Sequence, residues 1–214
     1  MISTSSLHAL PGIDELKRTC QSIAMLDAIV MDEWDYRYYS FDAQWGEGEM
    51  LASMRNGSGD WYYILFNPAG AIIKGFAHES AMARYAVDSG QIWRGVLDQI
   101  PPEFEQILND PAWVVEETTF CIWRKHEDPE WQTGDIEFPD QEDPDGSADL
   151  LVMLDGNPET YATWAAEYYE TTIPVEAVTE VYDHKPLTQQ LVSRLNSERL
   201  MDDLESDLKG IAYP

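Results

Sequence analysis

The chain opens with apolar side chains at helical spacing. Over residues 13–31 they recur every three or four positions, and Asp27 is the one carboxylate that interrupts the apolar stripe. Asp14 and Glu15 lie where the positive end of a helix dipole favours acidic side chains. The pattern predicts an N-terminal helix that packs one face against the core.

From residue 35 the pattern changes to the alternation that is typical of strands. The runs are rich in aromatic and β-branched side chains, and they cover residues 35–42, 49–55, 61–66 and 71–77. Two of the connections consist of turn residues, Asn-Gly-Ser-Gly-Asp at 56–60 and Asn-Pro-Ala-Gly at 67–70. Strands joined in this way predict an antiparallel β-meander over about residues 35–77.

Beyond the meander, helical and strand patterns alternate without a regular βαβ rhythm. Helices are predicted over residues 80–87, 91–99, 103–109, 157–169, 186–197 and 198–209. Further strands are predicted near 113–124 and 150–154, and residues 175–182 fit either a helix or a strand. We therefore expect an α+β fold, an antiparallel sheet with helices packed against it and a helical C-terminus. With no repeat and no clear linker, residues 1–214 are expected to form a single domain.

Residues 127–149 form the most unusual segment of the chain. They contain ten Asp or Glu and no Lys or Arg, with proline and glycine spaced among them. This composition predicts a long solvated loop, and loops of this length are usually functional or mobile. Trp131 lies alone in this acidic loop, where it either packs the loop against the body or serves as an exposed anchor for a partner.

The charge of the whole chain excludes some classes of partner. There are 13 Lys and Arg against 40 Asp and Glu, which gives a formal net charge of −27. Binding along a nucleic-acid backbone depends on Lys and Arg, and anionic membrane surfaces repel such a protein, so neither partner is expected. No apolar stretch approaches the length of a transmembrane helix, and residues 1–12 do not resemble a secretory signal. Two distant cysteines, Cys20 and Cys121, are typical of buried thiols in a reducing cytoplasm.

No motif assigns a catalytic group, a metal site or a cofactor. The turn at 57–60 lies between strands, so it lacks the helix N-terminus that a phosphate cradle needs. An EF-hand frame over the acidic loop would place Gln141 at its first ligand position and Val152 at its last, which excludes that site. The pair His78-Glu79 is either a catalytic dyad or an exposed imidazole before a helix.

Three segments carry a resemblance to known sequences. GSGDWYYILFNPAGAIIKGFAHES at 57–80, FCIWR at 120–124 and KPLTQQLVSRLN at 185–196 resemble an uncharacterised family of acidic bacterial proteins. The order of strand, Gly-x-Gly-Asp turn, strand and Asn-Pro-x-Gly turn also resembles the central sheet of the SUKH superfamily of toxin-immunity proteins. The Trp-containing segment and Asn-Gly element that usually precede that sheet are not evident, so no functional residue is carried over.

Together these features favour a cytosolic, non-enzymatic binding or inhibitory protein, for example of the immunity type. It would capture a basic protein through acidic surfaces, namely the acidic loop and the acidic C-terminal helix. The expected partner-binding residues in the loop are Glu130, Trp131, Asp135, Glu137, Asp140, Glu142, Asp143 and Asp145. The alternative is an enzyme or small-molecule-binding protein with a pocket between the sheet and the helices, lined by Tyr and Trp. A third interpretation is that the acidity only secures solubility.

Overall fold

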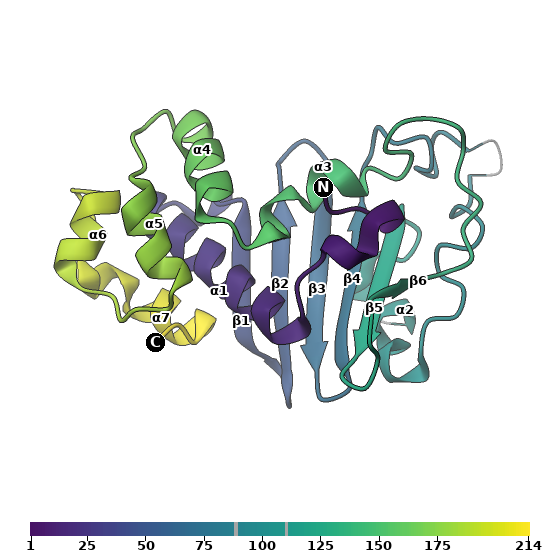
Figure 1. Cartoon of the computed structure of the whole chain (residues 1–214), viewed down its shortest axis with the longest axis horizontal. Helices are drawn as coiled ribbons and strands as arrows, with labels where there is room; N and C mark the ends of the chain where they lie inside the picture. Colours follow the sequence, from purple (N-terminus) through teal and green to yellow (C-terminus); the bar gives the residue numbers. More distant parts are fainter. Residues whose placement is uncertain (88–89, 110) are drawn as a thin grey trace.

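A computed structural model describes residues 1–87, 90–109 and 111–214. Its centre is an antiparallel sheet of six strands that pair in chain order, which confirms the α+β class (Figure 1). The strands are β1 Tyr39–Gly46, β2 Glu49–Arg55, β3 Trp61–Asn67, β4 Gly70–Phe76, β5 Phe120–Lys125 and β6 Gln132–Thr133. The first four strands confirm the meander that the alternating pattern predicted.

Two asparagines shape the turns of the meander. Asn56 Oδ1 accepts hydrogen bonds from the N–H groups of Ser58 and Asp60, which closes the connection between β2 and β3. In the next turn Asn67 Oδ1 accepts from the N–H groups of residues 69 and 70 in the same way. A Cβ on Gly70 would lie 2.1 Å from the carbonyl oxygen of Arg124 on β5, so only glycine fits there.

Helices and short 3-10 turns surround the sheet. The α-helices are α1 Ile13–Val30, α2 Gln106–Asn109, α3 Ser147–Leu150, α4 Pro158–Tyr168, α5 Val175–Tyr182, α6 Gln189–Leu195 and α7 Glu205–Ile211. The 3-10 turns are η1 Thr4–Ala9, η2 Trp34–Tyr36, η3 Pro102–Phe104, η4 Pro111–Trp113, η5 Val152–Asp155 and η6 Met201–Leu204. Figure 1 shows α1 lying along one face of the sheet, with α4 to α7 gathered beside the edge strand β1. Residues 175–182, for which the sequence allowed either a helix or a strand, form the helix α5.

The central strands are buried on both faces. Successive side chains point to opposite sides, so Ile64 and Ile73 join a large core with α1, whereas Leu65 and Ile72 join a second core on the other face. This second core is covered by the chain between β4 and β5, and it includes Trp123. Cys20 and Cys121 are free, buried thiols, as the sequence predicted, one in each core.

Asp27, the carboxylate that interrupts the helical stripe, has a structural role in the large core. It is fully buried, and its Oδ2 accepts hydrogen bonds from the N–H groups of Tyr38 and Tyr39, both at 2.9 Å. Its Oδ1 accepts from the hydroxyl of Tyr161 at 2.7 Å. Burial raises the pKa of Asp27 to about 6, although the hydrogen bonds partly oppose the shift. The carboxylate thus ties α1 to the start of β1 and to α4.

Lys74 has a structural role like that of Asp27, but on the face of the sheet that carries the second core. The side chain is fully buried, and Nζ donates to the carbonyl oxygens of Trp113 at 2.6 Å and Glu117 at 3.0 Å. The ammonium also lies 4.2 Å from the ring centroid of Trp61. Burial lowers the pKa of Lys74 to about 7. These bonds hold residues 113–117 in an irregular course, which is why the strand predicted at 113–124 begins only at Phe120.

Several predicted elements are wrong in type or extent. Residues 150–154 end α3 and form η5 instead of a strand, because buried Leu151 and Leu154 follow a helical spacing. Residues 35–42 start with the η2 turn, so β1 begins at Tyr39. Residues 80–87 and 91–99, which were predicted to be helices, form runs of turns instead.

Three more helices differ from the prediction mainly in length. Residues 103–109 contain only η3 and the four-residue α2, and α6 is shorter than the predicted 186–197. The last predicted helix divides into η6 and α7, which runs through Gly210 to Ile211. The helix predicted at 157–169 is present as α4, and Asn157 caps it because its Oδ1 accepts from the N–H of Glu159.

The buried carboxylate predicts a specific dependence of stability on pH. A folded-state pKa of about 6 lies above the ordinary value of 3.8, so the stabilisation from proton uptake at Asp27 is complete below pH 3.8 and is lost as the pH rises through about 6. Asp27→Asn keeps the shape but cannot titrate. We expect the free energy of unfolding of wild type minus that of Asp27→Asn to increase by about 2 kcal/mol from pH 7 to pH 4. Urea unfolding of both proteins at pH 7 and pH 4 measures this difference. A difference that is the same at both pH values would contradict the raised pKa of Asp27.

Candidate functional site

The acidic loop is held on the body by its apolar side chains. Trp131 is 4% exposed, packs in the large core, and donates a hydrogen bond from Nε1 to the carbonyl oxygen of Pro11 at 2.8 Å. Farther along, Ile136 and Phe138 pack against the second core. Of the two interpretations of Trp131, packing of the loop against the body is therefore confirmed, and the loop is only partly solvated.

Close backbone contact adds a second anchor. A Cβ on Gly134 would lie 1.9 Å from the carbonyl oxygen of Gly95, and a Cβ on Gly95 would lie 2.1 Å from that of Asp135. Gly95 also has a φ of +92°, which L side chains rarely adopt. Two glycines thus let the loop and the segment at 91–99 touch through their main chains.

Two of the predicted binding residues have internal partners. Asp145 is fully buried, with Oδ2 accepting from the hydroxyl of Thr4 at 2.6 Å and Oδ1 from the N–H of Ser147 at 2.9 Å. Burial raises its pKa, and the hydrogen bonds from Ser147 and Thr4 oppose this shift. Asp143 is half-buried and accepts from the first N–H groups of α3, those of residues 148 and 149. Like Trp131, Asp145 lies beneath the surface that a partner would meet.

The other five predicted residues are exposed. They are Glu130, Asp135, Glu137, Asp140 and Glu142. Within the described part of the chain, Glu127 is the only acid of the loop in an ion pair, with Lys125 at 3.0 Å. The loop therefore presents most of its carboxylates to solvent.

Part of this charge surrounds a concave site. A hollow of about 260 Å³ lies where the loop passes the start of β3 and the end of β4, and no Lys or Arg lines it. Its five carboxylates are those of Asp60, Glu79, Glu142, Asp143 and Asp149. We call it the acidic hollow. It brings together two of the predicted residues, Glu142 and Asp143, but not Glu130, Asp135 or Glu137.

Sequence reasoning did not connect the β2–β3 turn with the acidic loop. Asp60 accepts hydrogen bonds from the N–H of His78 at 2.8 Å and is 2.7 Å from its Nδ1, and it also accepts from the side chain of Asn56. Burial acts to raise the pKa of Asp60, but the bonds from His78 and Asn56 outweigh it and lower the pKa. The side-chain bond to Asp60 in turn raises the pKa of His78. His78 and Asp60 form an orienting pair at the edge of the hollow.

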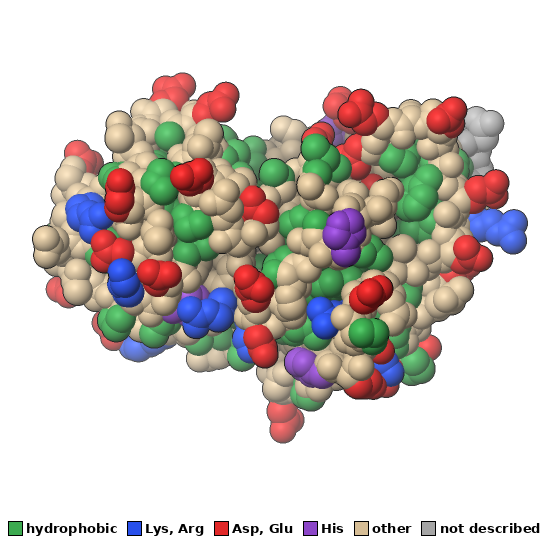
Figure 2. All heavy atoms as spheres, in the orientation of Figure 1, with side chains coloured by type: hydrophobic (Ala, Val, Ile, Leu, Met, Phe, Trp, Pro, Cys, Tyr) green, Lys and Arg blue, Asp and Glu red, His purple; other side chains and the backbone are tan. Residues whose placement is uncertain are grey.

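The acidic C-terminal helix does not extend the acidic hollow. α7 packs against β1, at the edge of the sheet opposite β5 and β6 (Figure 1). There Asp207 pairs with buried Arg37 at 2.7 Å, and Glu205 pairs with Lys209 at 2.6 Å. Figure 2 shows Lys and Arg gathered mainly on this side, whereas carboxylates spread over the whole visible face. The two acidic segments therefore form separate surfaces.

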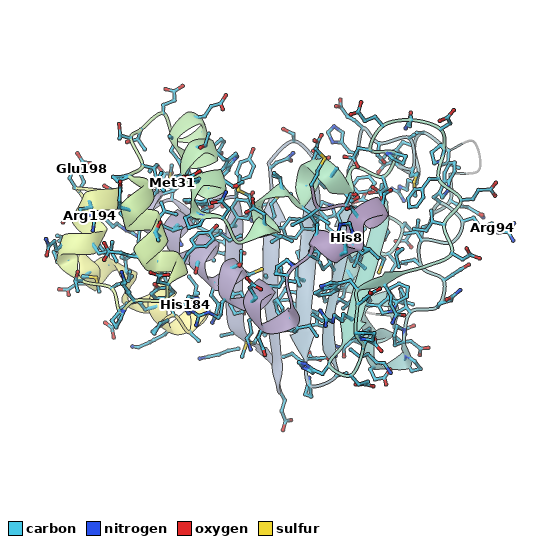
Figure 3. All side chains as sticks on the ribbon, viewed as in Figure 1. His8, Met31, Arg94, His184, Arg194 and Glu198 are labelled. Atoms are coloured by element: carbon cyan, nitrogen blue, oxygen red, sulfur yellow. The ribbon has the colours of Figure 1, made fainter. Side chains whose placement is uncertain are left out.

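Three further hollows contain tryptophan. A shallow one is lined by Trp93, Arg94 and residues 135–139 of the loop, and Figure 3 shows Arg94 pointing away from the body. A second, of about 340 Å³, lies against the sheet and contains Trp34 and Trp45, which are 53% and 44% exposed. The third lies next to it and shares Trp34 with it. The sequence analysis singled out Trp131 and not Trp34 or Trp45. Their adjacent runs alternate like buried strands, so the sequence contains no signal that would separate them.

The comparisons add no assignment. No protein-family model, curated protein or solved structure matches this chain. In the described residues, no group of three or more His, Cys, Asp or Glu is arranged to hold a metal ion. Over the same ranges, no helix is both long and apolar enough to cross a membrane.

The contact between Gly95 and the loop predicts a large difference between two glycine substitutions. Gly95→Ala puts a methyl group into the backbone of Asp135, so we expect a loss of about 3 kcal/mol of unfolding free energy. Gly57→Ala is the matched control, since its φ of +73° imposes similar strain but no atom lies within 4 Å of its Cβ. That variant should lose about 1 kcal/mol in urea unfolding. Equal losses would show that the loop does not depend on this contact.

The contact between His78 and Asp60 predicts how the pKa of His78 responds to a substitution. By NMR, His78 should titrate above pH 6.5, and Asp60→Asn should lower its pKa because the partner charge is removed. His184 is the internal control, because burial lowers its pKa and Asp60 is not among the groups that act on it. A His78 pKa that does not respond to Asp60→Asn would contradict the pairing.

Proposed function

We propose that this protein is a non-enzymatic cytoplasmic binding protein that captures a basic protein partner through the acidic hollow and the adjacent loop. An immunity-type inhibitor of a basic bacterial toxin is the form we favour. The observation that carries the proposal is the hollow itself, which is lined by five acidic residues and by no Lys or Arg.

The hollow has the size and chemistry for a basic side chain. Asp60 and Asp143 are held by internal hydrogen bonds, whereas Glu79, Glu142 and Asp149 are exposed. A Lys or Arg entering the hollow would form charge-assisted hydrogen bonds with carboxylates of both kinds. The internal bonds reduce the ordering that binding requires, because part of the site is already positioned.

Charge at longer range supports the same partner. A net charge of −27 accelerates the approach of a basic protein and disfavours acidic competitors. The exposed loop carboxylates concentrate this field beside the hollow. Anchoring by Trp131 and Gly134 keeps them at defined positions, which favours a specific partner over general attraction.

The thiols are consistent with a cytoplasmic location. Cys20 and Cys121 are unpaired, and burial raises the pKa of both. Protonated, buried thiols are poorly reactive, so they have structural places in the core. Unpaired cysteines are usual in a reducing compartment.

The proposal is tested with two variants of equal charge change. The site variant combines Glu79→Gln, Glu142→Gln and Asp149→Asn, and the control combines Glu167→Gln, Glu176→Gln and Asp202→Asn on exposed positions of the C-terminal helices. Proteins retained from the native host by wild type at 150 mM salt are identified, purified and measured for association rate and affinity. We expect a basic partner, an association rate that falls steeply with salt, and a loss of affinity of about tenfold or more in the site variant.

The control separates local contact from net charge. Because it changes the charge equally, it should reduce the affinity no more than about twofold. If both variants lose the same affinity for the partner, the attraction depends on net charge alone and the acidic hollow is not the binding site. A retained partner that is not basic, or an association rate indifferent to salt, would overturn the proposal.

A further inference from the structure

The second candidate site lies on the uncovered part of the sheet. The segment between β4 and β5 covers the second face over the central strands, and that core reaches only as far as Leu51 and Tyr63. Beyond it, β1 and β2 place polar side chains on this face: Ser40, Asp42 and Ser53. The resulting hollow of about 340 Å³, the aromatic groove, shares no lining residue with the acidic hollow.

The walls of the groove are aromatic. Trp34 lies before β1 and Trp45 near its end, and both are exposed although exposure of an indole is unfavourable. Tyr63 and Trp113 also line the groove, with ring centroids 5.6 Å apart in an edge-to-face arrangement. Three indoles and a phenol therefore surround a space large enough for a small ligand.

Two cations hold the tryptophan walls in place. Arg55 lies 5.1 Å from the ring centroid of Trp34, and its Nη2 donates to the carbonyl oxygen of Trp34 at 2.9 Å. At the other wall, buried Lys74 donates to the carbonyl oxygen of Trp113. Hydrogen bonds to the backbone carbonyl groups of Trp34 and Trp113 thus hold both residues in position. A ligand would therefore bind to rings that are already ordered.

The floor supplies a small set of polar groups. The hydroxyls of Ser40 and Ser53 are 2.5 Å apart across β1 and β2. Asp42 and Arg55 are the only charged residues among the groove's lining residues, so the lining is balanced in charge. In a chain with 40 acids and 13 bases, this balance distinguishes the groove from the acidic hollow.

From this chemistry we propose that the aromatic groove binds a neutral saccharide. A pyranose ring has an apolar C–H face that packs on indole, and its hydroxyls pair with hydroxyl, carboxylate and guanidinium groups. A cationic ligand is less suited because Arg55 already lies against Trp34, and an anionic one is repelled by the net charge. The site is independent of the acidic hollow and of any protein partner.

The test uses NMR titration of the full chain with cellotriose, maltotriose and chitotriose, preceded by a screen on an array of neutral glycans. A neutral saccharide should shift the amide signals of Ser40, Asp42 and Ser53 and the indole signals of Trp34 and Trp45. Trp45→Ala should weaken this binding about tenfold or more, and Asp42→Asn should weaken it by a smaller factor.

Tyr36→Ala is the matched control. Tyr36 is 56% exposed in the same short turn as Trp34 but does not line the groove, so this variant should bind like wild type. Thermal unfolding of all three variants checks that each is folded. The proposal is overturned if no neutral glycan shifts the groove signals, if Trp45→Ala binds normally, or if tetramethylammonium or adenosine binds there more tightly than any saccharide.

Discussion

Burial of the central strands on both faces is the constraint on which the rest of the structure depends. A strand such as β4, in which every residue is buried, needs apolar cover on two sides. α1 supplies one layer together with Ile2, Leu10, Trp131 and Leu154, and the irregular chain between β4 and β5 supplies the other. Polar groups inside these layers must then find partners, and Asp27 and Lys74 provide them, one on each face.

The same constraint explains the acidic loop. A segment with ten carboxylates would remain in solvent by composition alone, yet its few apolar residues complete both cores. Docking Trp131 and Phe138 forces the neighbouring carboxylates outward, where cations are too few to pair with them. The unpaired loop carboxylates at and beside the acidic hollow are therefore a consequence of how the loop is anchored.

The chain between β4 and β5 does not cover β1 and the outer part of β2, and the aromatic groove lies on this uncovered part of the sheet. The aromatic groove has balanced charge and exposed indoles, whereas the acidic hollow has only negative charge in its lining. The two sites suit different ligands, and they lie over different strands. This chain therefore has two separate hollows of different chemistry, and neither one depends on the other.

The sequence by itself determined the local elements in which one pattern dominates: the first helix, the four-strand meander with its asparagine turns, and the helix capped by Asn157. It failed at 80–99, 113–119 and 150–154, where apolar residues are placed by distant contacts and local spacing is ambiguous. For the site, it identified the carboxylate-rich loop but not Asp60 or Glu79, which join Glu142 only through folding. The sequence also could not tell that Trp131 is buried while Trp34 and Trp45 are exposed. Only the tertiary structure decided these points, because burial and proximity depend on which surfaces the sheet leaves uncovered, and periodicity records only neighbours along the chain.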